Sequence, residues 1–152
     1  GKTYHITGWK IGYCLAPSFL TSEFRKLHQW VTFSSATPLQ YALADYLKEP
    51  AHYLGLSDFY QKKRDLFASQ FSGTKWKVLP SAGSFFQCLD YSAISNEKDV
   101  DLADRLTREI KVASIPVSVF FETDPGDKIL RFCFAKEDDM LVEAAKRLVQ
   151  IL

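Results

Sequence analysis

Apolar residues recur at helical spacing in the first third of the chain. Leu20, Phe24, Leu27 and Val31 occupy positions i, i+4, i+7 and i+11, which places them on one side of an α-helix. This stripe predicts an amphipathic helix over residues 18–31.

The segment before this helix has a different pattern. Residues 9–16 are mostly apolar or aromatic, include Gly12, and stop at Pro17. A short apolar run with these boundaries is typical of a buried strand. We therefore expect a strand over residues 9–16.

Two further helices are expected between residues 37 and 73. Thr37 and Gln40 have the spacing of a capping box, with Pro38 at the first helical position. Pro50 is expected to end that helix, and Gly73 to close the next one, predicted over residues 58–71. The apolar residues expected to face inward from this later helix are Phe59, Leu66, Phe67 and Phe71.

From residue 75 onward, strands alternate with helices. Segments 75–78 and 84–90 predict two strands joined by a turn, and residues 129–135 predict a clear strand. A short strand is expected at 112–116, with helices after Asp99 and at the end of the chain. The apolar positions of the last helix are Leu141, Ala144, Ala145, Leu148 and Leu152. This order indicates an α+β fold or part of an α/β protein.

Composition narrows the class of protein. Of the 152 residues, 47% are hydrophobic and 24% are charged, which is typical of a globular domain with a packed core and not of a disordered chain. The net charge of +1 indicates neither nucleic acid nor an anionic membrane as a partner. No apolar run approaches the roughly 20 residues that a membrane-spanning helix needs.

The cysteines and histidines further limit the chemistry. Cys14, Cys88 and Cys133 are odd in number and lie in apolar segments, so we expect buried free thiols and not disulfides. Free thiols favour a reducing location such as the cytoplasm. The three histidines are too dispersed for a local metal motif, and we predict no metal site.

Arg131 is the most informative polar residue in the predicted strands. Strand alternation places it among apolar neighbours. A buried charge needs a partner, and the planar guanidinium matches a carboxylate through two parallel hydrogen bonds. Two structural alternatives stay open: a buried ion pair with an Asp or Glu of this chain, and an edge strand that exposes Arg131.

Lys2 and Lys10 lie in a segment with few other charges. A neighbouring cation favours the neutral form of an amine, which can then attack a carbonyl group. The alternative is that both lysines are solvated residues beside a loop. The glycines at positions 8 and 12 match neither the dinucleotide-binding nor the P-loop spacing.

Lys2 is followed by five residues and then by Gly8, Lys10 and Gly12. This spacing resembles the lysine motif of the class I/II (fold type I) pyridoxal-phosphate-dependent aminotransferases. Segments 33–38, 80–86 and 130–135 are similar to the interface loop, the small-domain hairpin and the substrate-arginine strand of this family. Within the family, the chain most resembles the methionine and kynurenine (glutamine-phenylpyruvate) aminotransferase branch.

The resemblance implies a role for five residues. Lys2 would bind pyridoxal 5'-phosphate covalently and, once released by the incoming amino acid, act as the general base. Lys10 would pair with the cofactor phosphate, and Arg131 with the α-carboxylate of the substrate. Phe33 and Ser34 lie in the loop that reaches the partner subunit's active site in family members, and they would help to recognise the substrate side chain.

The resemblance also implies a domain organisation and a reaction. Residues 1–50 would be the end of the large cofactor-binding domain of a fold type I transferase, and residues 51–152 its small C-terminal α+β domain. The enzyme would be a cytoplasmic homodimer without nucleic-acid or membrane partners. It would transfer the amino group of methionine or an aromatic amino acid to a 2-oxo acid by a ping-pong mechanism. Because the other cofactor contacts of the family precede the lysine, we expect the 152 residues alone to be inactive.

Two other functions stay open from the sequence. A C–S β-lyase would use the same Lys2 and Arg131, whereas a non-catalytic dimerisation or binding domain would keep the fold without using Lys2. Val117 stands where many relatives have Gly after Ile-Pro, and we expect it to alter the loop near the pocket.

Overall fold

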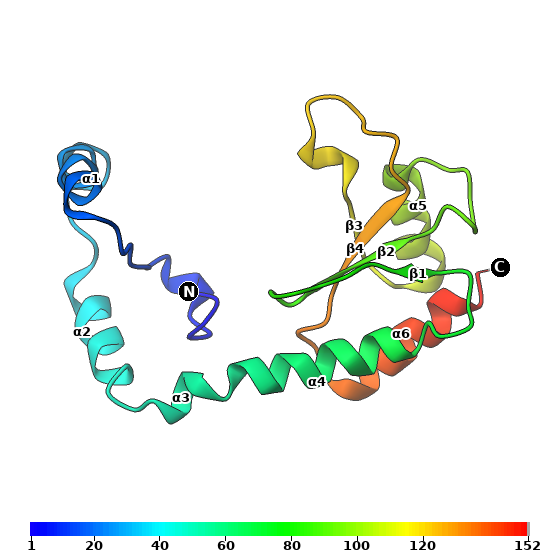
Figure 1. Ribbon diagram of the computed structural model, residues 1–152, viewed down its shortest axis with the longest axis horizontal. Helices are drawn as coiled ribbons and strands as arrows, with labels where there is room; N and C mark the ends of the chain where they lie inside the picture. Colours follow the sequence, from blue (N-terminus) through cyan, green and yellow to red (C-terminus); the bar gives the residue numbers. More distant parts are fainter. Residues whose placement is uncertain (152) are drawn as a thin grey trace. The chain divides into compact units, whose positions relative to one another are not determined.

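The computed structural model describes residues 1–151 and separates into two units, Gly1–Ser57 and a second unit that starts at Asp58 (Figure 1). Within the described residues, no helix combines the length and apolar character needed to cross a membrane.

The first unit contains helices and the loops between them. Helix α1 spans the predicted residues, and its apolar stripe is formed as expected. That stripe is nevertheless exposed, with Leu20 at 50% and Val31 at 82% of full exposure. The elements of this unit are η1 (Thr7–Trp9), α1 (Ser18–Val31), α2 (Thr37–Tyr46) and α3 (Ala51–Leu54).

The strand predicted over residues 9–16 is wrong. Trp9 ends the short helix η1, and residues 10–17 have no regular secondary structure. A strand needs a neighbouring strand for its backbone hydrogen bonds, and the described sheet lies entirely in the second unit. Cys14, expected to be buried, is therefore exposed.

The capping box at Thr37 is also wrong. Thr37 is already the first helical residue of α2, Ala36 takes the cap position, and no side chain caps the helix. Gln40 instead donates from its side-chain amide to the carbonyl of Ser35 at 2.9 Å. The helix ends at Tyr46, before the expected stop at Pro50.

The second unit is built on a four-stranded antiparallel sheet in the order β1-β2-β4-β3. The hairpin and the clear strand predicted from the sequence are confirmed, and the short strand is formed over two residues. The strands are β1 (Lys77–Val78), β2 (Phe86–Asp90), β3 (Ile115–Pro116) and β4 (Ile129–Cys133).

Three helical segments pack with one face of this sheet. The helices predicted in this half of the chain are confirmed, although Phe59, expected to face inward from α4, is 48% exposed. Leu152, assigned to the last helix, lies outside the described residues. The segments are α4 (Leu56–Ser69), α5 (Asp99–Arg105) with its continuation η2 (Leu106–Ile110), and α6 (Asp138–Val149).

The two faces of the sheet differ in burial. Along β2 and β4 the burial alternates strictly, so Leu89, Leu130 and Phe132 face the core. The alternate positions on both strands, which include Cys88 and Arg131, are half-buried. Since the side-chain period of a strand is two, the same alternation forms the core and presents Arg131 on the opposite face.

Replacement of Leu130 by alanine tests the contribution of this core. Leu130 is 0% exposed, so Leu130→Ala leaves a cavity and should lower the free energy of unfolding by about 2–5 kcal/mol. Urea-induced unfolding followed by circular dichroism measures the change. Val100→Ala, at a position that is 47% exposed, is the control and should stay within about 0.5 kcal/mol of wild type. Equal effects of the two substitutions would contradict the packing described.

The segment before α5 is held by Glu97, and this contact predicts a pH dependence. Arg105 donates to both carboxylate oxygens of Glu97, at 2.7 and 3.1 Å, and Ser95 donates at 2.8 Å. Hydrogen bonding to Arg105, together with that to Ser95, holds the pKa of Glu97 below its ordinary value.

A lowered pKa in the folded state means that ionised Glu97 stabilises the fold above its unfolded pKa of about 4.3, and that this contribution is lost as the pH falls through the lower folded value. Glu97→Gln should therefore reduce the free energy of unfolding at pH 7 by about 0.5–1 kcal/mol, because the pair is partly exposed. The difference in the free energy of unfolding between Glu97→Gln and wild type should become smaller below a pH of about 4. Glu122→Gln, at an exposed site, is the control, and a difference independent of pH would exclude this role for the Glu97 carboxylate.

Candidate active site

Lys2 lies in a turn closed by backbone hydrogen bonds. The amide of Ile6 donates to the carbonyl of Gly1 at 2.9 Å, and the amide of His5 donates to the carbonyl of Lys2 at 3.4 Å. His5 takes up a left-handed backbone conformation, with φ of 57°, which allows the chain to reverse direction. The side chain of Lys2 is exposed.

Tyr4 anchors this turn to the helices of the first unit. Its ring packs edge-on against Tyr46 and Tyr53, with centroids 5.8 and 5.9 Å apart, and its hydroxyl lies 3.1 Å from that of Tyr13. The hydrogen bond with Tyr13 raises the pKa of Tyr4 to about 12. The phenol is therefore protonated near neutral pH and acts as an anchor for the residues around Lys2.

Lys10 follows the short helix η1 directly. Its backbone is left-handed, with φ of 53°, and its amide donates to the carbonyl of Thr7 at 3.4 Å. The side chain is exposed. Among residues 1–151, neither Lys2 nor Lys10 forms an ion pair. Both amines are therefore available to a ligand. The same exposure also fits the alternative, in which both lysines are solvated residues beside a loop.

Phe33 and Ser34 lie in the loop after α1. The amide of Phe33 donates to the carbonyl of His28 at 2.9 Å and closes the helix. Phe33 has φ of 67° and is 83% exposed, a conformation that costs a non-glycine residue about 1–2 kcal/mol. Ser34 is also exposed.

The guanidinium of Arg131 contacts two aromatic rings. Its central carbon is 4.2 Å from the centroid of Phe86 and 4.9 Å from that of Phe120. Both contacts are cation–π interactions, in which the ring faces attract the cation. Arg131 belongs to β4, which pairs with β2 on one side and β3 on the other. The alternative of an edge strand is therefore wrong.

Arg131 also has no acidic partner within the described part of the chain. None of the ion pairs formed there includes it, and its Nε is buried without a hydrogen-bond partner. Cys88 is its neighbour in the strand register. Burial raises the pKa of the Cys88 thiol, and the charge of Arg131 only opposes that shift, so the thiol is neutral at neutral pH. The alternative of an internal ion pair is wrong, and the cation is free to bind an anion.

Sequence patterns did not identify four residues: two that contact Arg131 and two that hold the helix of one of these contacts. Phe86 and Phe120 stack on the guanidinium, while Asp99 accepts hydrogen bonds from Ser118, two residues before Phe120. Strand alternation could place Phe86 and Cys88 on one face of β2. Only the register of β2 against β4 shows that this face is the one that carries Arg131.

Val117 sits at the start of η3 (Ser118–Phe120), with φ of −84° and ψ of −27°. This is an ordinary right-handed conformation that any residue except proline adopts readily. The backbone at this position therefore does not require glycine.

The five residues predicted for the site fall in both units. Lys2, Lys10, Phe33 and Ser34 belong to the first unit, and Arg131 belongs to the second.

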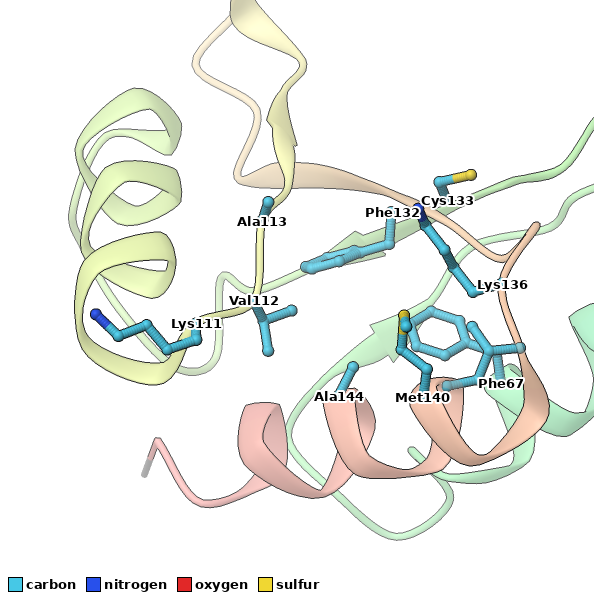
Figure 2. A pocket seen from close by; sticks show the side chains of 10 residues that line it. Phe67, Lys111, Val112, Ala113, Phe132, Cys133, Lys136, Met140 and Ala144 are labelled. Atoms are coloured by element: carbon cyan, nitrogen blue, oxygen red, sulfur yellow. The ribbon is translucent and has the colours of Figure 1, made fainter.

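A separate cavity of about 190 Å³ lies in the second unit (Figure 2). It lies beside α6 and the end of β4, and its lining includes the apolar residues Phe67, Phe132 and Met140. Lys111 extends away from these side chains in Figure 2, and its amine donates to the carbonyl of Arg108 at 2.6 Å. Arg131 and the two lysines of the first unit do not line this cavity.

Comparison with protein families and with known proteins gives a consistent result. The family described as aminotransferase class I and II matches residues 1–148. Methionine aminotransferase of Escherichia coli is 49% identical over 152 residues, which cover 99% of this chain and 39% of the relative. Kynurenine–oxoglutarate transaminase of Dictyostelium discoideum is 31% identical over 173 residues, covering 99% of this chain and 40% of the relative.

Solved structures agree with the sequence comparisons. The crystal structure of YbdL from Escherichia coli, described as having a methionine aminotransferase function, has a TM-score of 0.92 and 50% identity, and the match covers 99% of this chain and 40% of that one. Bna3p of Saccharomyces cerevisiae, described as a putative kynurenine aminotransferase, has a TM-score of 0.90 and 27% identity over 99% of this chain and 40% of that one. The chain thus spans about two-fifths of the length of the proteins it matches.

The unpaired state of Arg131 leads to a stability prediction. Arg131→Met removes a cation that has no internal ion pair and keeps an apolar side chain between the rings. The free energy of unfolding should therefore change by less than about 1 kcal/mol, whereas disrupting a buried ion pair costs about 3–5 kcal/mol.

Arg105→Met is the matched control, because it removes the two hydrogen bonds to Glu97. Urea-induced unfolding at pH 7 should show the larger loss for Arg105→Met. A larger loss for Arg131→Met would mean that Arg131 mainly stabilises the fold.

Proposed function

The chain is a member of the class I and II aminotransferase family, and on this basis we propose that it contributes Lys2, Lys10 and Arg131 to the active site of a pyridoxal-phosphate-dependent aminotransferase. The observation that carries the proposal is the Arg131 guanidinium, which contacts the faces of two aromatic rings and has no acidic partner in the described chain. Such a cation suits the α-carboxylate of an amino acid.

The residues of the first unit fit pyridoxal 5'-phosphate. The cofactor offers an aldehyde and a phosphate, and the loop around Lys2 and Lys10 offers two exposed amines without ion pairs among residues 1–151. Lys2 would hold the aldehyde carbon covalently, and the ammonium of Lys10 would balance the phosphate charge. When bound, the cofactor supplies an electron sink for the negative charge left at the substrate Cα.

Lys2 then has a second task once the substrate amine has replaced it. Its amine would take the proton from the substrate Cα as a general base. The turn of residues 1–6 and the anchoring of Tyr4 fix the backbone from which this amine extends. This fixed backbone favours proton transfer, because a positioned base reacts more readily than a mobile one.

The proposed role of Arg131 is to bind the α-carboxylate of the substrate. A carboxylate bound by the fork of the guanidinium is held in a defined plane by two parallel hydrogen bonds. Methionine and aromatic amino acids are the proposed amino donors, and a 2-oxo acid is the acceptor in a ping-pong reaction. The relatives at 49% and 31% identity, a methionine aminotransferase and a kynurenine transaminase, support this substrate class.

The surroundings of the site are part of the proposal. Residues 1–50 would belong to the large cofactor-binding domain and residues 51–152 to the small one, in a homodimer whose interface loop contains Phe33 and Ser34. The exposed apolar stripe of α1 supports this, because large exposed apolar surfaces mark sites that other protein parts cover. Three free thiols support a cytoplasmic location.

Loss of the Lys2 amine tests the covalent and proton-transfer roles. In the cofactor-loaded enzyme that contains this chain, L-methionine without any 2-oxo acid should abolish the visible absorption of the lysine-bound cofactor. Lys2→Ala should show neither that absorption nor transamination, with a loss in kcat of at least about 10⁴-fold, since general base catalysis alone contributes about 10²–10⁴-fold.

Lys26→Ala, at an exposed position of α1, is the control and should behave as wild type. Unchanged transamination in Lys2→Ala would favour the non-catalytic binding domain. Release of ammonia and pyruvate from an S-substituted cysteine without an acceptor would favour the C–S β-lyase.

Loss of the Arg131 guanidinium tests the binding of the α-carboxylate. Arg131→Ala should raise the KM of every amino donor by about 10–150-fold, because a charged hydrogen-bonded contact contributes about 1.5–3 kcal/mol. Steady-state kinetics with methionine and phenylalanine measure the effect. An equal KM in wild type and variant would remove Arg131 from substrate binding.

A further inference from the structure

We propose that Asp99, Ser118 and Phe120 act together to position the guanidinium of Arg131, and that this arrangement increases the preference of the site for substrates with a carboxylate. The inference rests on the proposed carboxylate-binding role of Arg131. Phe120 acts by contact with Arg131, whereas Asp99 and Ser118 act through Phe120.

Phe120 contacts Arg131 from outside the sheet. Phe86 lies on β2 two residues from Cys88, the register partner of Arg131, so the sheet fixes the backbone from which its ring extends. Phe120 comes from the short helix η3, and its ring centroid lies 4.9 Å from the guanidinium carbon. At 61% exposure, Phe120 contributes little to the core. The cation–π contact with Arg131 is therefore the main specific interaction of the Phe120 side chain among the described residues.

Contacts with two ring faces restrict the orientation of the guanidinium. Aromatic faces attract the flat face of an arginine, while the N–H donors point outward along its edge. With Phe86 and Phe120 both in contact, the plane of the group is restrained and its edge remains available to a carboxylate. Binding then costs less conformational entropy, because the side chain is ordered before the ligand arrives.

Asp99 holds the helix that carries Phe120. Its two carboxylate oxygens accept from Ser118, one from the backbone amide at 2.7 Å and the other from the hydroxyl at 2.6 Å. Asp99 is 4% exposed, and a buried carboxylate is stable only with such hydrogen bonds. Both of these bonds go to the first residue of η3, so the buried carboxylate fixes this helix to α5.

The short helix depends on this support. A three-residue 3-10 helix has weak internal hydrogen bonding. The backbone amides of Phe120 and Phe121 donate to the carbonyls of Val117 and Ser118 at 3.2 and 3.0 Å. Loss of the bonds to Asp99 would allow η3 to move, and Phe120 would leave the guanidinium. Asp99 and Ser118 are therefore positioning residues.

The test measures the preference for a carboxylate directly. The probes are 4-(methylsulfanyl)butanoate, which has the carbon skeleton of methionine without its amino group, and the corresponding neutral amide. Equilibrium titration of the cofactor-loaded enzyme that contains this chain yields a dissociation constant for each probe. The ratio of the two constants is the carboxylate preference, and it requires no turnover.

Phe120→Ala should reduce this preference about five-fold, because one of the two stacking contacts is lost. Ser118→Ala removes one of the two bonds to Asp99 and should reduce it about three-fold. Ser118→Thr keeps the hydroxyl and should restore the wild-type ratio. Val119→Ala, at a residue of η3 that is 56% exposed, is the matched control and should also keep it.

The outcomes separate this inference from the proposed function. If Arg131→Ala abolishes the preference while Phe120→Ala and Ser118→Ala leave it unchanged, the positioning role is wrong and the proposed function stands. If Arg131→Ala also leaves the preference unchanged, the carboxylate-binding role fails, and the positioning role fails with it. Equal weakening of both probes in Ser118→Ala would reveal a general structural role and would overturn the inference.

Discussion

The antiparallel pairing of β2 with β4 is the interaction on which the rest of the second unit depends. Its register sets Cys88 opposite Arg131 and Leu89 opposite Leu130. Leu89 and Leu130 are fully buried in the core, and the alternate positions form the other face. A slip of one residue would place the arginine in the core and the leucine outside it. The free energy gained by burying the leucines therefore also determines where the guanidinium lies.

The environment of Arg131 is unfavourable for a residue with a purely structural role. Its Nε is buried without a hydrogen-bond partner in the described chain, and an unpaired buried donor costs about 1–3 kcal/mol. The rings of Phe86 and Phe120 compensate in part through cation–π contacts. The neutral thiol of Cys88 supplies no charge. An anionic ligand would satisfy the remaining donors, in agreement with the proposed binding of an α-carboxylate.

The two units provide different parts of the proposed chemistry. In the first unit, backbone hydrogen bonds and the buried ring of Tyr4 fix the loop of Lys2 and Lys10, while the amines themselves stay exposed. In the second unit, a packed core supports the sheet face that carries Arg131, a cation without an ion pair among the described residues. Amines suit an aldehyde and a phosphate, and a guanidinium suits a carboxylate. The proposed transamination requires binding of all three groups: the aldehyde, the phosphate and the carboxylate.

Local sequence patterns determined much of the secondary structure. Helical spacing predicted α1, and strand alternation predicted β2, β4 and the special position of Arg131, because these signals depend only on the period of the backbone. The strand at residues 9–16 and the cap at Thr37 were not correctly predicted, since a strand needs a partner and a cap depends on a shift of one residue. The lysine motif identified Lys2 and Lys10 by family resemblance, and their roles stay predictions. Only the tertiary structure decided what surrounds Arg131. The two rings that contact it come from β2 and η3, and the carboxylate that holds η3 comes from α5. These contacts join residues far apart in sequence, and a pattern of local period carries no information about the register and packing that bring them together.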